Sequence, residues 1–434
     1  MFKKIVTLIL FFLLQFFVLD VKANKIFVYL NFKNYKHIKG WIKLEKVYIK
    51  KNNFNYNLVK NFTIKITPPG QYFLGYTEIS PGKAKIFFKI KSINFSIKTK
   101  KFKSLLKVPL TIEESKEPIL IFLELDLEKS FKKGIFYPAL TVKSFSNIKA
   151  IQLIIALDKY NQGFWIVNSV SNRVVGFKKL NCSPDYMEKG LDNNIYLVCR
   201  NKLEILDYPD FQIENLVPIG SGNEFNYLIV GGNKLLLISY EDQKIAMLDL
   251  DSGGVLGEKY FTQLPISGAY IAKVNGFLVG TQDGKVHFFS LALENLGEVS
   301  LAGVPETILG YKDKVFIGDN QGWITIYKIP SFQRIEKLKV CDFVEDLKLC
   351  KDKIVVSCKD GKLAYFYPEE PQIVDYIDTE SLLGRLAFNP YQNLIYVIAK
   401  NDDNNKILII NNFDFKKEGE IPLGGPVNEI VSLP

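Results

Sequence analysis

The chain of 434 residues is too long for one ordinary domain, and its 47% hydrophobic and 13% aromatic residues exclude wholesale disorder. Its net charge of +10 comes from 52 Lys and four Arg against 46 acidic residues. With two His and no C-x-x-C-H, the sequence excludes His-rich metal centres and haem c attachment. It also lacks a G-x-S-x-G, a Walker loop and a dinucleotide fingerprint, so we expect no catalytic residue, no cofactor and no metal site.

The N-terminus has the pattern of a secretory signal over residues 1–23. Two Lys precede an apolar run at 5–19, and Val21 and Ala23 occupy the small-residue positions before a cleavage site. The apolar run is short for a membrane span, which needs about 20 residues, so a cleaved signal and an uncleaved anchor are the two alternatives. No later stretch predicts a transmembrane span. The signal predicts a periplasmic or secreted protein of a bacterial envelope, where nucleic acid is not an expected partner.

Residues 24–147 are predicted to form a small basic β-sandwich, because runs rich in Ile, Phe, Tyr and Val alternate with turn residues. Residues 24–150 hold 25 Lys and 8 acids, net +17, whereas residues 151–434 hold 28 basic and 37 acidic residues, net −9. Alternation places six Lys on one sheet face: Lys83, Lys85, Lys89, Lys91, Lys98 and Lys100. Three interpretations stay open: this face binds an envelope polyanion such as lipopolysaccharide or an acidic glycan, the two oppositely charged domains dock, or the Lys are solvated surface in a compositionally biased chain.

From residue 164 a pattern of an apolar β-run, a polar turn and a second β-run returns seven times. The residues after each turn are Arg173, Lys202, Lys244, Lys285, Trp323, Lys362 and Lys406. Their spacing is about 40 residues, apart from a shorter first step, and such a period with several strands per unit is typical of propeller blades. The sequence thus predicts an all-β fold with a seven-bladed β-propeller over residues 148–434. Both the C-terminal run 426–434 and the run 151–157 fit the innermost strand that closes the ring, and the sequence leaves this choice open.

Two stretches carry a family resemblance. The last repeat (393–431) resembles the YVTN-type propeller repeat of exported bacterial proteins in its "IYV" strand, its "KILIIN" strand and "IPLGGP". WD-repeat propellers are the wider relatives, although their Gly-His and Trp-Asp dipeptides are absent. Residues 67–76, TPPGQYFLGY, resemble transthyretin-like or carboxypeptidase-regulatory-like sandwich modules over those few residues. These resemblances imply a fold and leave the function open.

The five cysteines suggest two disulfides. The spacing from Cys182 to Cys199 equals that from Cys341 to Cys358, and each pair takes the same place in its predicted blade. Disulfides persist in the oxidising compartment that the signal predicts, so we expect both pairs to be bridged and Cys350 to remain a buried thiol. The alternative is five small buried apolar residues.

Acidic residues recur at the predicted hairpin turns on the face of the cysteine pairs. They are Asp242, Asp283, Asp319, Asp360 and Asp402, with Glu241 and Asp403 beside them. One interpretation is a partial acidic ring that attracts a cation, a basic partner or the basic domain. The other is ordinary turn chemistry, since Asp favours tight turns.

The leading functional hypothesis is an exported, non-enzymatic interaction platform with a basic domain that contacts a protein partner or a polyanionic surface. The alternative is a propeller enzyme of the quinoprotein, lactonase or lyase type with its site at the channel mouth. Scarcity of His and Arg counts against that alternative, and His287 is expected to pack within a strand rather than act as a base. A third possibility is a redox accessory beside an electron-transfer subunit.

Overall fold

The fold is taken from a computed structural model that describes residues 23–35, 38–96, 101–115, 118–132, 135–136, 138–144, 152–199, 201–219, 224–400 and 405–434. The predicted signal lies outside the described residues except for Ala23. Within the described part, none of the helices combines the length and the apolar character that a membrane crossing requires. The chain divides into two compact units near residue 144, with the loop Thr67–Gln71 grouped with the second unit.

The first unit is a β-sandwich, because the apolar residues of two four-stranded sheets share one core cluster. One sheet runs in the order β11 (Ala139–Ser144), β8 (Ile119–Asp126), β1 (Asn24–Lys33) and β4 (Gln71–Ile79), with β1 and β8 parallel. The other runs β3 (Phe54–Lys65), β2 (Gly40–Lys51), β5 (Gly82–Phe95) and β7 (Leu105–Ile112). A short helix α2 (Leu127–Ser130) and a small sheet of β6 (Lys101–Phe102), β10 (Ile135–Phe136) and β9 (Phe131–Lys132) complete the described elements of this unit.

The alternation predicted for the Lys-rich strand is present in β5. Lys83, Lys85, Lys89 and Lys91 are exposed, and between them the buried residues include Ala84, Ile86, Phe88 and Ile90. An extended chain sends successive side chains to opposite faces, so the four Lys lie outside and the apolar residues face the core. Lys98 and Lys100 lie outside the described residues.

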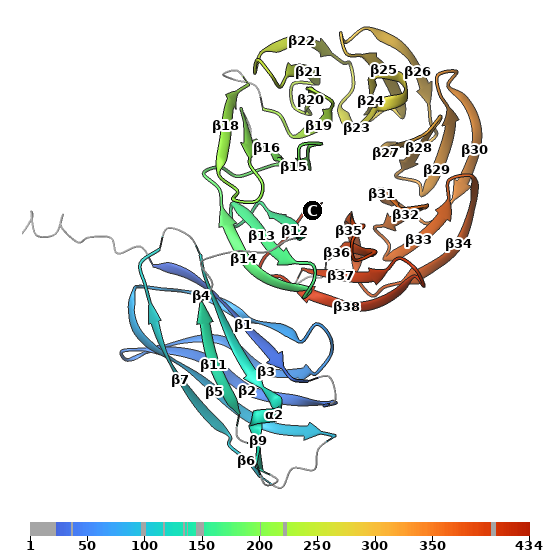
Figure 1. Cartoon of the computed structure of the whole chain (residues 1–434). Coiled ribbons are helices and arrows are strands. Elements are labelled where there is room, and N and C mark those ends of the chain that lie inside the picture. Colours follow the sequence, from blue (N-terminus) through green and yellow to red (C-terminus); the bar gives the residue numbers. More distant parts are fainter. Residues whose placement is uncertain are drawn as a thin grey trace, which may run out of the picture. The chain divides into compact units, whose positions relative to one another are not determined.

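The second unit is a ring of four-stranded sheets, and Figure 1 shows them arranged like the blades of a propeller around a centre. Seven such sheets are formed by the described residues from Leu153 to Leu433. The innermost strands, from the first sheet to the seventh, are β39 (Glu429–Leu433), β15 (Tyr186–Lys189), β19 (Tyr227–Gly231), β23 (Pro265–Ile271), β27 (Pro305–Tyr311), β31 (Val344–Cys350) and β35 (Leu382–Asn389). The prediction of an all-β propeller is confirmed.

Three further strands complete each sheet outward. The second strands are β12 (Leu153–Asp158), β16 (Ile195–Cys199), β20 (Lys234–Ser239), β24 (Gly276–Thr281), β28 (Lys314–Asp319), β32 (Lys353–Cys358) and β36 (Leu394–Lys400). The third are β13 (Gly163–Asn168), β17 (Lys202–Leu206), β21 (Lys244–Asp249), β25 (Lys285–Ser290), β29 (Trp323–Lys328), β33 (Lys362–Tyr367) and β37 (Lys406–Asn411). The outer strands are β14 (Arg173–Lys179), β18 (Ile213–Pro218), β22 (Val255–Tyr260), β26 (Asn295–Ser300), β30 (Gln333–Lys339), β34 (Glu370–Asp378) and β38 (Lys416–Pro422), and a 3-10 turn η1 (Ala272–Val274) follows β23.

The ring is closed by the C-terminal strand. β39 pairs antiparallel with β12, with Ile430 opposite Ala156, so the C-terminal run takes the innermost place and the run after residue 151 becomes a second strand. This answers the question that the sequence left open. Closure in this way pairs the edges of the first and last segments of the ring.

The same closure shows that the first predicted repeat was assigned to the wrong strands of its sheet. The segment 164–177 covers the third and outer strands, β13 and β14, whereas the other six repeats cover second and third strands. Arg173 therefore opens an outer strand, and the residue that matches the other six positions is Gly163, which opens the third strand β13. The short first step, from Arg173 to Lys202, reflects a wrong assignment, caused by an innermost strand that comes from the far end of the chain.

Candidate functional sites in the propeller channel and on the basic sheet

A cavity of about 470 Å³ lies at the centre of the ring, and all seven innermost strands line it. This volume falls within the range of roughly 300–1,000 Å³ that is usual for small-molecule sites. The charged lining residues are Glu188, Lys189, Asp346, Lys348, Arg385 and Glu429. Three carboxyl groups thus face three cationic groups, which makes the lining polar and balanced in formal charge.

At one level of the ring, each innermost strand carries a polar residue. We call this set the polar belt: Tyr186, Tyr227, Ser267, Thr307, Asp346, Arg385 and Glu429. Six of them lie opposite the residue just before the end of the second strand, as Tyr186 lies opposite Val198. Arg385 takes the corresponding place in an irregular stretch of β35, directly before Leu386.

Several belt residues join one sheet to the next. The Ser267 hydroxyl donates to the carbonyl oxygen of Pro305 at 2.5 Å. The Thr307 hydroxyl donates to Asp346 at 3.4 Å, and the backbone N–H of Leu386 donates to the same carboxylate at 2.8 Å. These bonds stabilise neighbouring sheets against each other across the interior of the ring.

Arg385 is the cationic centre of the belt. Its Nη1 lies 3.4 Å from Asp346 Oδ1 and its Nε lies 3.5 Å from Glu429 Oε1. Both distances are long for a charge-assisted hydrogen bond, which is about 2.7–2.9 Å. Arg385 lines the cavity and 21% of its side chain remains accessible, so a molecule in the channel can contact this side chain.

The two carboxyl groups beside Arg385 differ in their surroundings. Asp346 accepts backbone hydrogen bonds from Leu347 and Leu386 at 2.9 and 2.8 Å. Burial raises the pKa of Glu429 to about 8, against the opposing charge of Arg385. Burial also disfavours the charge of Arg385, but Glu429 and Asp346 outweigh it and hold the pKa of Arg385 well above its usual value. At neutral pH the cluster therefore offers both hydrogen-bond donors and acceptors.

Two tyrosines and a third carboxyl group lie on the adjoining strands. The rings of Tyr186 and Tyr227 have centroids 4.0 Å apart, and burial raises the pKa of both hydroxyls. Glu188 accepts a hydrogen bond from the Val230 backbone N–H at 3.0 Å. Burial raises the pKa of Glu188 to about 7, although that bond and the charge of Lys348 act in the other direction. This arc of the channel thus combines aromatic surface with groups that can gain or lose a proton.

The basic face of the sandwich is wider than the sequence indicated. Residues that lie opposite each other in neighbouring strands share a face of the sheet. We define the basic face by Lys46, Lys50, Lys60, Lys83, Lys85, Lys89 and Lys107 on β2, β3, β5 and β7. At its centre the rings of Tyr48 and Phe87 stack with centroids 4.9 Å apart.

Like charges stand directly opposite one another on this face. Lys46 lies opposite Lys60 on one side and Lys89 on the other, and Lys50 lies opposite Lys85. Such pairs destabilise a sheet. Lys89 has an acidic partner, Glu45, at 2.6 Å. The face therefore has an excess of positive charge that a bound anion would compensate.

Four of the hairpin acids accept hydrogen bonds from neighbouring groups. Asp319 is fully buried, and one of its oxygens accepts the backbone N–H groups of Gln321 and Trp323. Asp242 contacts Ser239, Asp283 accepts from the Thr281 hydroxyl, and Asp360 accepts from the Asp342 backbone. For Asp319 the expectation of an exposed acidic ring is wrong, because the carboxylate caps the turn. Asp402 lies outside the described residues.

Two acids of the innermost strands stand on β-bulges. Glu306 and Glu345 are the extra residues where the pairing shifts between Pro305 and Thr307 and between Val344 and Asp346. Bulges re-aim side chains and are common near functional sites. Burial raises the pKa of Glu306, and Glu345 pairs with Lys359 at 3.3 Å.

Both equally spaced cysteine pairs are disulfide-bonded, Cys182 with Cys199 and Cys341 with Cys358. Cys350 is a buried free thiol whose pKa is raised by burial.

His287 lies within β25, where its Nδ1 is 3.3 Å from Glu298, and it is not among the residues that line the channel cavity. His37 lies outside the described residues.

The polar belt was missed at the sequence level. The sequence carries no distinct signal for it, because the innermost strands carry other polar residues beside the belt, such as Glu306 next to Thr307 and Glu345 next to Asp346. In the sequence, Arg385 is one of only four Arg residues, and this small number argues against a propeller enzyme. Its partnership with Glu429 depends on the closure of the ring, which the sequence left open.

Comparison with known proteins finds likeness in structure alone. No protein-family model matches the chain, and no curated protein matches its sequence. The solved structure of the RRP9 WD40 repeats is similar with a TM-score of 0.51 at 11% identity, over 58% of this chain and 85% of that one. The likeness shows a β-propeller.

Two other solved structures give the same result. Dihydro-heme d1 dehydrogenase NirN has a TM-score of 0.51 at 10% identity, over 67% of this chain and 77% of that one. U3-55K has a TM-score of 0.51 at 10% identity, over 58% and 86%. Such low identities establish the fold, and a propeller fold accommodates unrelated functions.

Proposed function

We propose that this protein is an exported interaction platform whose basic face binds a polyanion of the cell envelope, such as lipopolysaccharide or an acidic glycan. The observation that carries the proposal is the row Lys60–Lys46–Lys89 across three neighbouring strands, with Lys50 opposite Lys85. Strands are about 4.8 Å apart and alternate residues about 6.7 Å apart, so these amines form a dense planar array. A surface that concentrates repelling cations gains most from an anion with closely spaced charges.

Export to the envelope is part of the proposal. Two disulfides are consistent with an oxidising compartment outside the cytoplasm. The signal pattern of residues 1–23 and the YVTN-type resemblance of residues 393–431 support the same location. The sandwich would then present its basic face to the envelope. The resemblance of residues 67–76 to transthyretin-like modules is compatible with such a sandwich.

Binding of the full chain to polyanions tests this function. Lipopolysaccharide, polygalacturonate and anionic vesicles are compared with a neutral dextran and neutral vesicles, at low and high salt. We expect salt-sensitive binding to the anionic probes. A Lys near an anionic surface contributes about 1 kcal/mol, so the variant Lys46→Glu/Lys85→Glu should bind roughly 30-fold more weakly or worse.

A matched control separates this face from net charge. The variant Lys259→Glu/Lys416→Glu makes the same charge change at exposed positions of the propeller. We expect it to bind like the unmodified protein. Equal weakening by both variants would show that overall charge, rather than the basic face, governs binding.

A second candidate function is binding of a small uncharged polyhydroxyl ligand, such as a saccharide, in the channel. It is favoured by the cluster of Arg385, Asp346 and Glu429 beside the Tyr186–Tyr227 pair. These side chains present both hydrogen-bond donors and acceptors, and the hydroxyls of a saccharide can both donate and accept. The presence of Arg385 in the channel also removes one argument against a propeller enzyme.

Calorimetric titration with a panel of methyl glycosides and N-acetylglucosamine tests this candidate. Loss of one hydrogen bond should weaken a bound saccharide roughly tenfold in Glu429→Gln or Tyr227→Phe. Glu298→Gln, on an outer strand, is the control and should not change the affinity. Absence of binding across the panel would eliminate the saccharide.

A further inference from the structure

Each disulfide has a carboxyl group beside it. The sulfur atoms of Cys182 and Cys199 and an oxygen of Glu204 lie within 4.8 Å of one another, and so do the corresponding atoms of Cys341, Cys358 and Asp360. While a disulfide is intact, its sulfur atoms are bonded to each other and are not thiolate ligands. The same three groups acquire different chemistry once the bridge is reduced.

Glu204 is an unusual residue for its position. It lies on β17, in the interior of the second sheet, and only 3% of it is exposed. Within the described part of the chain, its Oε2 atom has no hydrogen-bond partner. Burial raises the pKa of this carboxyl, with a smaller opposing effect from Lys202. A buried polar atom without a partner loses the hydrogen bonds that water would give it, so the fold retains an unfavourable group at this point.

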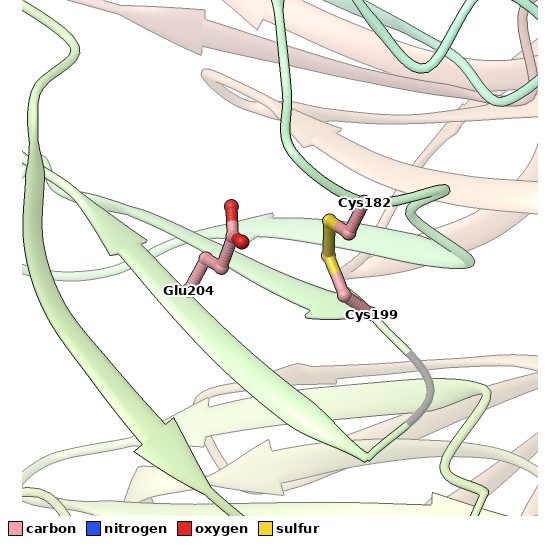
Figure 2. A group of neighbouring side chains, drawn as sticks. All are labelled: Cys182, Cys199 and Glu204. Carbon is pink, nitrogen blue, oxygen red and sulfur yellow. A yellow bond between two sulfur atoms is a disulfide. The ribbon is translucent and has the colours of Figure 1, made fainter.

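The carboxyl group of Glu204 stands next to the disulfide, as Figure 2 shows. Cys199 is buried, whereas Cys182 is partly exposed. Two thiolates and one carboxylate are typical ligands of Zn²⁺, which binds sulfur at about 2.3 Å and carboxylate oxygen at about 2.0–2.2 Å. Water can supply the fourth position of a tetrahedral site.

We propose that Cys182, Cys199 and Glu204 form a redox-gated site that binds Zn²⁺, or a similar thiophilic divalent cation, when the Cys182–Cys199 bridge is reduced. A dithiol, which becomes a disulfide, or a phosphine, which takes oxygen from water and becomes a phosphine oxide, supplies two electrons. The S–S bond breaks, and each sulfur takes a proton from the dithiol or from water and becomes a thiol. The cation then displaces the two thiol protons and any proton on Glu204. A small-molecule disulfide reverses the step: it accepts two electrons and becomes two thiols, the protein S–S bond forms again, and the cation leaves.

The second cysteine pair provides an internal comparison. Asp360 is exposed, and its carboxylate already accepts backbone hydrogen bonds from Asp342 and Lys362 at 3.1 and 3.4 Å. It is therefore a weaker third ligand than the buried Glu204. We expect the first triad to bind Zn²⁺ more tightly than the second.

Metal titration of the full chain tests the proposal. The protein is reduced with a phosphine that does not compete as a thiol, and Zn²⁺ binding is measured against a chromophoric chelator, with Co²⁺ absorption as a report on thiolate ligation. We expect tight binding of about one Zn²⁺ by the reduced protein and none by the oxidised protein. Glu204→Gln should weaken the tight site roughly tenfold or more, while Asp360→Asn should leave it unchanged.

Cysteine variants and a refolding measurement complete the test. Cys182→Ser/Cys199→Ser should abolish the tight site, and Cys341→Ser/Cys358→Ser should retain it. If reduction unfolds the protein, circular dichroism should show that Zn²⁺ restores the fold of the unmodified chain and not that of Glu204→Gln. Equal Zn²⁺ binding before and after reduction, or an unchanged affinity in Glu204→Gln, would overturn the proposal, as would a failure of Zn²⁺ to restore a reduced, unfolded chain.

Discussion

The Nε atom of Arg385 lies 3.5 Å from Oε1 of Glu429, and this contact joins the innermost strand of the seventh sheet to the C-terminal strand. Glu429 stands on β39, which completes the first sheet, so the pair spans the point where the ring closes. Asp346 on the sixth sheet contacts the same guanidinium group. One cation thus connects three consecutive sheets at the level of the polar belt.

The protonation of the buried glutamates predicts how stability depends on pH. The pKa is raised to about 8 for Glu429 and to about 7 for Glu188, so the folded state holds more protons than the unfolded state above their ordinary pKa near 4.5. Their contribution is fully present below that pH and is lost as the pH rises through about 7 and 8. Denaturant unfolding from pH 5 to 9 should show a falling free energy of unfolding.

Substitution assigns that decline to its residues. Glu429→Gln should remove the decline between about pH 7 and 8 and the Glu429 share of the decline at lower pH, because the amide does not ionise. Glu298→Gln is the control: its pKa is lowered by Lys285, so it acts in the opposite direction at lower pH and should leave the alkaline decline intact. A decline that persists unchanged in Glu429→Gln and in Glu188→Gln contradicts the assignment.

Ring closure by β39 predicts a large effect of one buried side chain. Ile430 is 4% exposed and lies opposite Ala156. Ile430→Ala should lower the free energy of unfolding by about 2–5 kcal/mol, because it removes packed volume where the ring closes. Val374→Ala, at a position that is 50% exposed, should change stability by no more than about 0.5 kcal/mol. Equal effects of the two substitutions would show that the C-terminal strand does not hold the ring closed.

The two disulfides predict a simple thiol count. Alkylation of the denatured, unreduced protein should label Cys350 alone, and the native protein should resist labelling because that thiol is buried. Removal of either bridge by paired Cys→Ser substitution should cost on the order of 3 kcal/mol in the chain-entropy model. Mass mapping that finds five free thiols in the oxidised protein would refute both bridges.

One glycine is required by a close approach of two chain segments. Gly322 has φ +76°, and a Cβ atom there would lie 1.7 Å from the carbonyl oxygen of Cys341. Gly322→Ala should therefore destabilise the protein by several kcal/mol, on the order of 3 or more. Gly232 has φ +63° with open space around it, so Gly232→Ala should cost only about 1 kcal/mol. Thermal unfolding of both variants measures the difference.

The sequence predicted the propeller because its strands recur within a local unit. The hairpin from Lys314 to Lys328 contains its apolar runs, its turn and its register in one short stretch of chain. The first sheet could not be assigned in the same way, since its second strand β12 pairs with an innermost strand from the opposite end of the propeller sequence. The prediction therefore put Arg173 at the start of the third strand, whereas it begins the outer strand β14.

The functional residues were harder to predict than the fold, because they come together through pairing between strands that are distant in the sequence. Lys83 and Lys85 were assigned to one face by alternation within their own strand, and the structure places them there. Their opposition to Lys46 and Lys50 required the pairing of β2 with β5, which the sequence does not encode locally. Arg385 and Glu429 meet only through ring closure, so composition alone suggested an absence where the structure has a cluster.

The most direct test of the proposed function is the salt dependence of polyanion binding by the full chain. The affinity for lipopolysaccharide is measured from low to high ionic strength for the unmodified protein and for Lys46→Glu/Lys85→Glu. We predict that the unmodified protein loses affinity steeply as salt shortens the Debye length from about 30 Å to about 8 Å, and that the variant binds weakly throughout. An affinity that does not change with salt, or that the variant retains, would contradict a polyanion site on the basic face.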